Sequence, residues 1–270
     1  MKATTFIPIF LSTFFKEIRS KTLIITMIFT VILIFLINSG MDFLISMVPE
    51  NAPMDLSTQK ISMFFFFVST WASVLCVIFG TDTISSDLDS GVASVLFPLP
   101  IRRIEYLVAR ILGTSSIVII YFIISLALAM ILLSITGSGA GFHFGVIQGV
   151  VATSLSVLGL VTVSLLLSFY MNRLLAFIGT FLFSGLLTIA NQSLGSEKFA
   201  DMLSDMTAFK GVGLFLYWLF PHIGTWSAMS TKFLSEEVLE VNLVFEIIHF
   251  FVTYGVLLFL INWVLNKKEV

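Results

Sequence analysis

Long apolar stretches alternate with short polar segments along the whole chain. A charge-free run of about 20 residues is long enough to cross the hydrocarbon core of a bilayer as an α-helix. No Asp, Glu, Lys or Arg occurs from 111 to 172, and the sequence TGSGAG at 136–141 divides this run in two. The pattern predicts six membrane-spanning helices, over 22–40, 61–80, 111–135, 144–169, 174–194 and 246–266.

A further charge-free window covers 211–231, but its apolar part, 212–220, is too short to span a bilayer. Pro221 and His222 follow at once, and proline does not continue a helix. We therefore expect a re-entrant or surface-lying hairpin, which a membrane tolerates where protein or water satisfies the backbone. The hairpin belongs to a long outer region over 195–244.

Apolar residues also recur at helical spacing before the first span, at Phe6, Ile7, Phe10, Leu11, Phe14, Phe15 and Ile18. Lys16, Glu17 and Arg19 follow or interrupt them. This pattern predicts an amphipathic helix over 5–19 that lies on the membrane surface. The alternative is an early start of the first span, which would bring Lys16 to Lys21 into the bilayer at considerable cost.

The composition agrees with an all-α integral membrane protein in which 1–270 form one transmembrane domain. The chain is 58% hydrophobic and 11% charged, whereas soluble domains are typically about 25% charged. A net charge of −2 gives no basic footprint for nucleic acid, so we expect no nucleic-acid partner. Cys76 is the only cysteine, which excludes an intrachain disulfide, and its apolar neighbours predict a packing role.

Basic residues indicate the orientation of the spans. With the N-terminus in the cytoplasm, ten Lys and Arg residues lie inside and four lie outside, in agreement with the positive-inside rule. Counting 211–231 as a seventh span would move Lys267 and Lys268 outside. We therefore expect a multi-pass protein of the cell (cytoplasmic) membrane with both termini in the cytoplasm.

The segment 81–110 is charged, although it lies between two apolar spans. Solvation alone explains a short polar loop, but this segment is about 30 residues long and contains apolar residues as well. We expect one or two short helices against the membrane, with Asp87 and Asp89 near a helix start, where the helix dipole favours acidic residues. Pro98 and Pro100 would end that helix.

The same segment carries a motif, formed by Asp82, Ile84, Asp87, Asp89, Gly91, Leu96, Pro100, Ile101, Arg103, Glu105 and Arg110. Its spacing resembles the signature of ABC-2 type permeases, the membrane subunits of ATP-binding cassette (ABC) transporters. Asp87 replaces the usual Glu, Val92 the usual Thr, and Ala109-Arg110 the usual Gly-Lys. The six spans, the N-terminal surface helix and the sequence LYWLFPHIG at 216–224 are also similar to this family.

The resemblance implies that a separate cytosolic ABC ATPase subunit drives the chain through a coupling helix, here within 82–97. We expect the docking face to consist of Asp82, Asp87, Asp89 and Gly91. The rest of the segment comprises Pro100, Arg102, Arg103, Glu105 and Arg110. Its three arginines are expected to anchor it to lipid headgroups.

The chain contains no G-x-x-x-x-G-K-[ST] phosphate loop, so we expect no cofactor in it and no catalysis by it. ATP and Mg²⁺ would bind to the partner ATPase. The resemblance implies that two permease copies or homologues line an export pathway, with membrane lipid and an outer accessory protein as further partners. Gly145, Gly149 and Thr153 permit close helix contact, either inside the chain or with the second copy.

A polytopic membrane enzyme is the main alternative. Glu236-Glu237 begins like the EE-x-x-x-R motif of intramembrane proteases, but Val241 stands where the Arg is needed. No G-x-S-x-G motif occurs, and His143, His222 and His249 form no H-E-x-x-H pair for zinc, so we predict no metal site.

An ATP-independent transporter or scaffold is the third class. Ion-coupled carriers often place ionisable residues at mid-membrane. The interiors of the six expected spans offer none, which argues against this class. Glu246 is expected to face water or a polar neighbour at the outer end of the sixth span.

Overall fold

The computed structural model of the chain describes residues 3–46, 56–92, 102–136, 144–194, 208–234 and 242–267. These ranges contain α-helices and no strand, which confirms the all-α class. Six helices in the described ranges are long and apolar enough to cross a membrane, as expected. They are α2 (Lys21–Ser46), α3 (Leu56–Asp82), α6 (Arg103–Ile135), α7 (Phe144–Ser168), α8 (Arg173–Leu194) and α12 (Leu243–Lys267).

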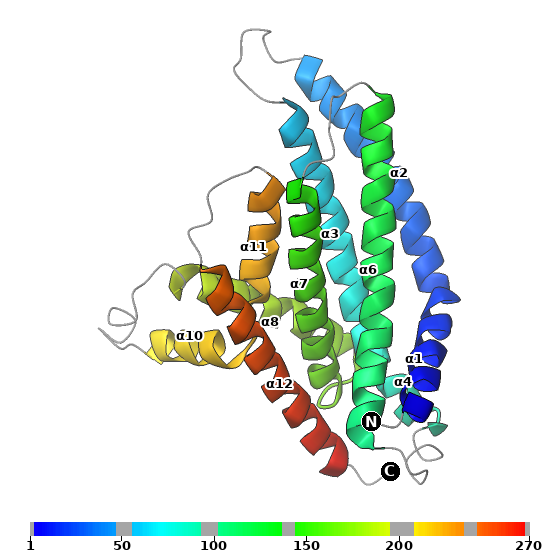
Figure 1. The fold of residues 1–270 in the computed structure, drawn as a ribbon, viewed down its shortest axis with the longest axis vertical. Helices are drawn as coiled ribbons and strands as arrows, with labels where there is room; N and C mark the ends of the chain where they lie inside the picture. Colours follow the sequence, from blue (N-terminus) through cyan, green and yellow to red (C-terminus); the bar gives the residue numbers. More distant parts are fainter. Residues whose placement is uncertain are drawn as a thin grey trace.

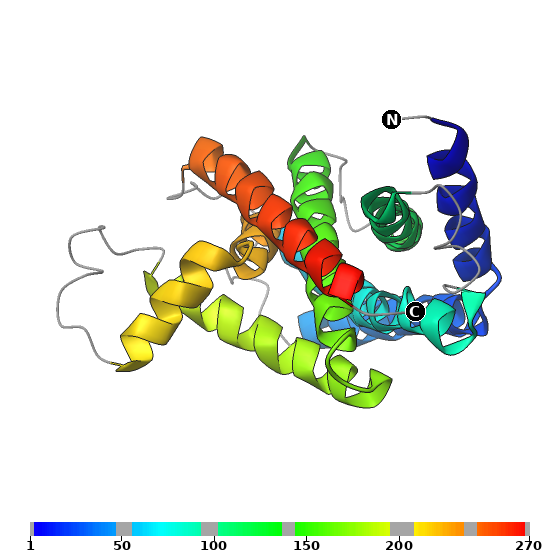
Figure 2. The same cartoon turned by 90° about the horizontal axis from the view of Figure 1, so that it is seen from below.

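The helices α3, α6 and α7 pack against one another and run along the long axis of the molecule, with α2 beside α3 and α6 (Figure 1). α8 differs from this pattern, because it runs largely in the plane of Figure 2, across the direction of α6. α6 begins at Arg103, eight residues before the expected start at 111. Tyr106 and Leu107 are buried, and their packing extends the helix beyond the charge-free window.

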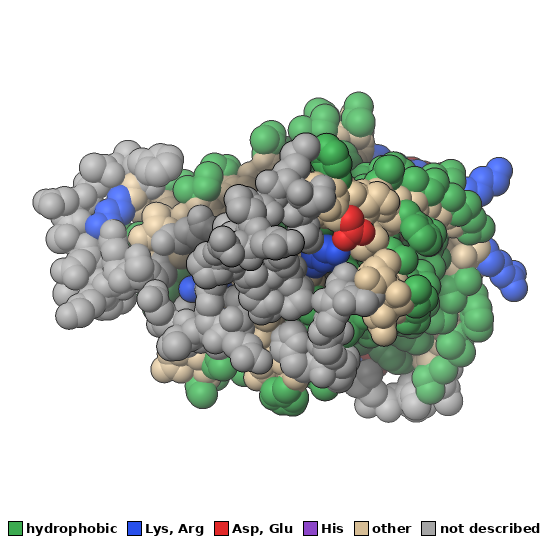
Figure 3. Space-filling model, turned by 90° about the horizontal axis from the view of Figure 1, so that it is seen from above, with side chains coloured by type: hydrophobic (Ala, Val, Ile, Leu, Met, Phe, Trp, Pro, Cys, Tyr) green, Lys and Arg blue, Asp and Glu red, His purple; other side chains and the backbone are tan. Residues whose placement is uncertain are grey.

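The core of the bundle is built from large side chains of α3 and α6, among them Phe65, Leu75 and Phe122. Many apolar side chains instead point outward, such as Leu36 at 66% exposure and Phe259 at 68%. Hydrophobic side chains accordingly appear around the sides of the space-filling view (Figure 3). Apolar surface of this extent is expected where helices face lipid.

At Gly149, α7 makes a close contact within the subunit. A Cβ at Gly149 would lie 3.1 Å from the Ser230 carbonyl oxygen and 3.2 Å from the Phe65 ring. The close approach that the sequence left open therefore joins α7 to α3 and to α11 (Ile223–Leu234) within one subunit.

An N-terminal helix, α1 (Ala3–Ile18), is separate from α2, because the chain leaves helical geometry at Arg19 and Ser20. α1 lies largely in the plane of Figure 2, whereas α6 is seen nearly end-on. Ile9, Thr13 and Glu17 recur every four residues and are buried on the side of α1 that packs against α6.

The charge-free window over 211–231 forms two short helices instead of a span. These are α10 (Ala208–Leu219) and α11, which meet at Pro221, where a proline interrupts the helical backbone. α10 lies across the long axis, and α11 packs lengthwise against α7 (Figure 1). The parts of the expected outer region at 195–207 and 235–241 lie outside the described residues.

Candidate functional site

The expected coupling segment contains a five-residue helix, α4 (Ser85–Asp89), directly after α3. α4 lies at the same end of the molecule as α1 and the last turn of α12 (Figure 1). We call this the α4 end. Gly91 has a φ of 74°, a left-handed conformation that favours glycine. Pro100 lies outside the described residues.

Asp87 and Arg110 form a buried ion pair beneath α4. Asp87 is 5% exposed, and its carboxylate pairs with the Arg110 guanidinium and accepts a 2.5 Å hydrogen bond from the Tyr106 hydroxyl. Arg110 also donates to Thr13 Oγ1 of α1 at 2.9 Å. Burying both charges is tolerable only because each has a partner.

Two expectations are therefore wrong. Asp87 is not on an exposed docking face, because its carboxylate points inward to Arg110. Arg110 does not anchor the segment to lipid headgroups, because it is 6% exposed and committed to Asp87 and Thr13. An arginine 23 positions from its acidic partner gives no local sign of that pairing.

A second, more exposed network surrounds Asp82. Arg173 at the start of α8 pairs with Asp82 and with Asp89, each through a 2.9 Å contact. Lys16 of α1 lies 3.9 Å from Asp82 and donates a 2.7 Å hydrogen bond to Ser86. Each exposed pair stabilises the fold by at most about 1 kcal/mol. Their importance is geometric, because they join α1, α3, α4 and α8.

The arginines at the start of α6 have different surroundings. Arg103 donates a 2.9 Å hydrogen bond to the Leu265 carbonyl oxygen, which ties α6 to the last turns of α12. A cation at that position also suits the negative end of the helix dipole. Glu105 lies in the first turn of α6, where an acidic side chain is favoured. Arg102 is exposed, and its expected contact with lipid stays a prediction.

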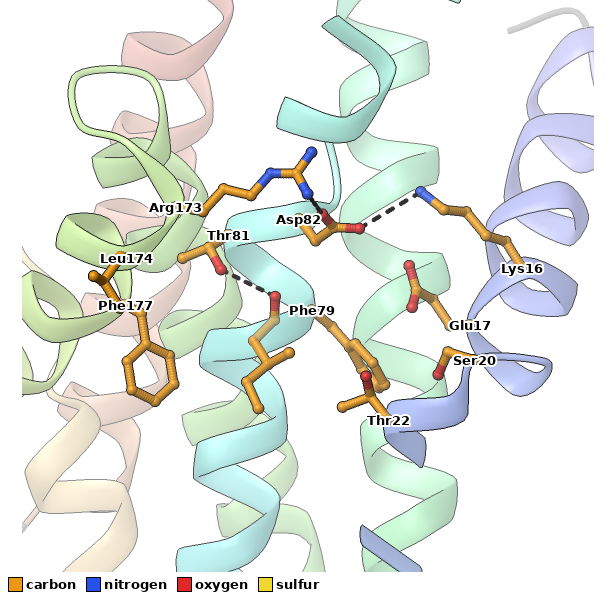
Figure 4. Close-up of a pocket in the computed structure, with 11 residues that line it drawn as sticks. Lys16, Glu17, Ser20, Thr22, Phe79, Thr81, Asp82, Arg173, Leu174 and Phe177 are labelled. Atoms are coloured by element: carbon orange, nitrogen blue, oxygen red, sulfur yellow. Dashed lines mark hydrogen bonds and ion pairs between the residues drawn. The ribbon is translucent and has the colours of Figure 1, made fainter. Parts of the chain in front are cut away.

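A cavity of about 580 Å³ opens between α1, α3 and α8 at this end of the molecule. Figure 4 shows Arg173 and Lys16 reaching Asp82 from opposite sides, with the Glu17 carboxyl below them pointing from α1 toward α3. The lining residues are Lys16, Glu17, Ser20, Thr22, Ile78, Phe79, Thr81, Asp82, Arg173, Leu174 and Phe177.

Glu17 is the unusual group in this cavity. It is 3% exposed, and its Oε1 has no hydrogen-bond partner. The pKa of Glu17 is raised from 4.5 to about 7, chiefly by burial. Asp82 and Asp87 contribute to this increase, whereas Lys16 and Arg110 oppose it. The carboxyl group therefore changes charge near neutral pH.

A second polar cluster lies where α10 and α11 meet α12. His222 Nδ1 lies 2.8 Å from Glu246 Oε2, and His222 Nε2 lies 2.9 Å from the Tyr217 carbonyl oxygen. Because a carbonyl oxygen only accepts, Nε2 is the donor to Tyr217, and Nδ1 faces the Glu246 carboxyl group. The ring of His249 stacks on His222 with 3.9 Å between centroids.

Of the two expected surroundings of Glu246, the structure shows the polar neighbour, because the side chain is 3% exposed and paired with His222. Glu246 and His249 are buried near the start of α12, and Arg110 is buried in the first turns of α6. In the described part of the chain, no group of three His, Cys, Asp or Glu side chains is arranged to hold a metal ion.

Comparisons with protein-family models, curated proteins and solved structures found no match. Sequence reasoning found the α4 segment but missed Glu17 and the His222–Glu246 pair. For Glu17, the available signal was its spacing of four and eight residues from Thr13 and Ile9 on a helix.

Proposed function

We propose that this chain is the membrane-spanning permease subunit of an ABC transporter, driven by a separate ATPase that docks at the α4 end. One observation supports this most directly. α4 is a short helix between two span-length helices, and ion pairs or hydrogen bonds link it to α1, α6 and α8. A helix held in this way can transmit a displacement to several spans at once.

The contacts that join α4 to α6, α8 and α1 differ in how easily they break, so we infer that α4 moves with some of these helices and shifts relative to others. The buried Asp87–Arg110 pair moves α4 and α6 together, because separating the two charges would leave both desolvated and unpaired. The Asp89–Arg173 and Ser86–Lys16 contacts are exposed, so water replaces them at low cost when α8 or α1 shifts.

Because Asp87 is buried, we propose a docking face that differs from the one expected from the sequence. Asp89, whose side chain is 70% exposed, and Val92, at 41% exposure, present a small surface around Ser90 and Gly91. Asp82 and Asp87 act behind this surface, through Arg173 and Arg110. The turn at Gly91 lets the backbone approach a partner closely.

The remaining parts of the proposal follow from the family resemblance. The α4 end faces the cytoplasm of a cell membrane, α1 lies on the inner membrane surface, and the α10–α11 pair is a re-entrant hairpin on the outer side. Two copies or homologues line an export pathway. ATP and Mg²⁺ bind to the ATPase, and an outer accessory protein completes the assembly.

A second candidate is an ATP-independent, ion-coupled transporter. The buried His222–Glu246 pair favours it, because ionisable residues within membrane spans often belong to proton or ion pathways. Transport that follows a proton gradient and continues without ATP would support this candidate over the first.

Purification of the tagged chain from its native membrane tests the first proposal. We expect a protein with a G-x-x-x-x-G-K-[ST] loop to co-purify in a fixed ratio, as measured by mass spectrometry. Asp89→Lys should reduce its recovery severalfold, whereas Glu105→Gln, away from the docking face, should not. Recovery of the chain without any such ATPase would contradict the proposal.

A further inference from the structure

The cavity between α1, α3 and α8 has a polar mouth and an apolar interior. Lys16, Asp82 and Arg173 lie at the mouth and are between 33% and 50% exposed. Ile78 and Phe79 of α3, with Phe177 of α8, supply an apolar wall. A volume of about 580 Å³ falls within the usual size range of small-molecule sites.

The charges at the mouth are already paired with one another. Asp82 contacts Arg173 at 2.9 Å and Lys16 at 3.9 Å, and each cation has another partner, Asp89 for Arg173 and Ser86 for Lys16. An incoming anion would have to displace these contacts. The mouth therefore favours neither sign of charge strongly.

Glu17 differs because Oε1, a hydrogen-bond acceptor when ionised, is buried in the cavity wall without a partner. A buried acceptor without a donor costs roughly 1–3 kcal/mol, so a ligand that supplies a donor recovers that free energy. Among the lining groups, the Glu17 carboxylate would therefore be stabilised most by a ligand that donates a hydrogen bond.

We propose that this cavity binds an amphiphilic amine, with the ammonium group on Glu17 and the apolar body along Ile78, Phe79 and Phe177. An ammonium group supplies both the missing donor and a countercharge for the carboxylate. Thr22 and Thr81 also line the cavity. Binding at this site requires no ATPase, so its test is independent of the proposed transport function.

Binding of the amine and ionisation of Glu17 are linked, because the ammonium group pairs only with the carboxylate form. The charged groups that face Glu17 are Lys16 on α1, Asp82 on α3, Asp87 on α4 and Arg110 on α6. Burial leaves the pKa of Glu17 near 7, so affinity should fall as the pH is lowered from 8 to 6.

Fluorescence anisotropy with the chain in lipid nanodiscs tests the site. The probes are 1-naphthylmethylamine, its neutral analogue 1-naphthylmethanol and the anion 1-naphthylacetate, with empty nanodiscs subtracted. At pH 8 we expect the amine to bind at least tenfold more tightly than the alcohol. Glu17→Gln should remove this preference and its pH dependence, whereas Glu105→Gln should retain both.

Equal affinity of the wild type and Glu17→Gln for the amine would overturn the proposal, as would tightest binding of the anion. A second variant covers the case in which Glu17→Gln does not fold. Ser20→Cys places a thiol in the cavity wall while Cys76 stays fully buried. The amine, and not the alcohol, should slow alkylation of that thiol at pH 8, and equal protection by both would count against the site.

Discussion

At the scale of single residues, the Asp87–Arg110 pair determines how α4 is held. Its two side chains are each 7% exposed, and Tyr106 and Thr13 supply the nearest hydrogen bonds. Arg110 Nε has no partner, so the pair leaves part of the guanidinium unsatisfied. The desolvation cost makes such a pair sensitive to the loss of either partner.

Asp87→Asn should therefore destabilise the fold by about 3–5 kcal/mol, because Arg110 is left buried without its countercharge. Asp89→Asn is the matched control, because it breaks an exposed pair with Arg173 and should cost at most about 1 kcal/mol. Thermal or denaturant unfolding in detergent measures both. Equal losses in the two variants would contradict the buried pairing.

Glu17 gives the protein a pH dependence of known sign. Its pKa is raised from 4.5 to about 7 in the folded chain, so the folded state holds a proton that the unfolded state releases. The stabilisation is present below pH 4.5 and is lost as the pH rises through 7, a change of about 3 kcal/mol. Glu17→Gln should be more stable than the wild type at pH 8.

The comparison is best made as the difference in unfolding free energy between the wild type and Glu17→Gln, measured from pH 5 to pH 8. This difference removes the contribution of the other titrating groups. A difference that does not change with pH would show that the Glu17 carboxyl reaches water in the folded protein.

At the scale of elements, the spans could be predicted and their packing could not. A charge-free window is a local property, so α2, α3, α7 and α12 were expected near their observed positions. α8 runs crosswise and contacts α10 and α11, the next two described helices, and contacts between helices are not visible in a local sequence window. The pairing of His222 with Glu246 is likewise a contact between separate parts of the chain.

Close contact between α11 and α8 carries a direct prediction. A Cβ at Gly224 would lie 2.7 Å from Thr188 Oγ1 and 2.8 Å from Thr188 Cα, so Gly224→Ala must push the two helices apart. We expect a loss of roughly 1–3 kcal/mol in unfolding experiments.

Gly211→Ala provides the control on α10, because no atom lies within 4 Å of its added Cβ. Alanine is the better helix former by about 1 kcal/mol, so this variant should be neutral or more stable. If both glycine variants behaved alike, α11 would not be packed against α8 as described.

At the scale of the whole molecule, the apolar helix surfaces and the charged α4 end divide the protein into two environments. Composition and charge were enough to predict that division, because they depend only on how many charges occur and where. The role of each acidic residue depended on three-dimensional contacts. Asp82, Asp87 and Asp89 are close together in sequence, yet Asp87 pairs with Arg110 of α6, whereas Asp82 and Asp89 share Arg173 of α8. The three side chains also differ widely in exposure.

The most direct test of the central claim is site-specific cross-linking at α4. Ser90 is exposed, and Cys76 is fully buried, so Ser90→Cys carries one accessible thiol. A short thiol–amine cross-linker applied to native membranes should join it to a phosphate-loop ATPase, identified by mass spectrometry. Ile135→Cys, at the far end of α6, should give no such product (Figure 1). Absence of an ATPase adduct at position 90, or equal adducts at both positions, would contradict the proposal that α4 couples the spans to an ATPase.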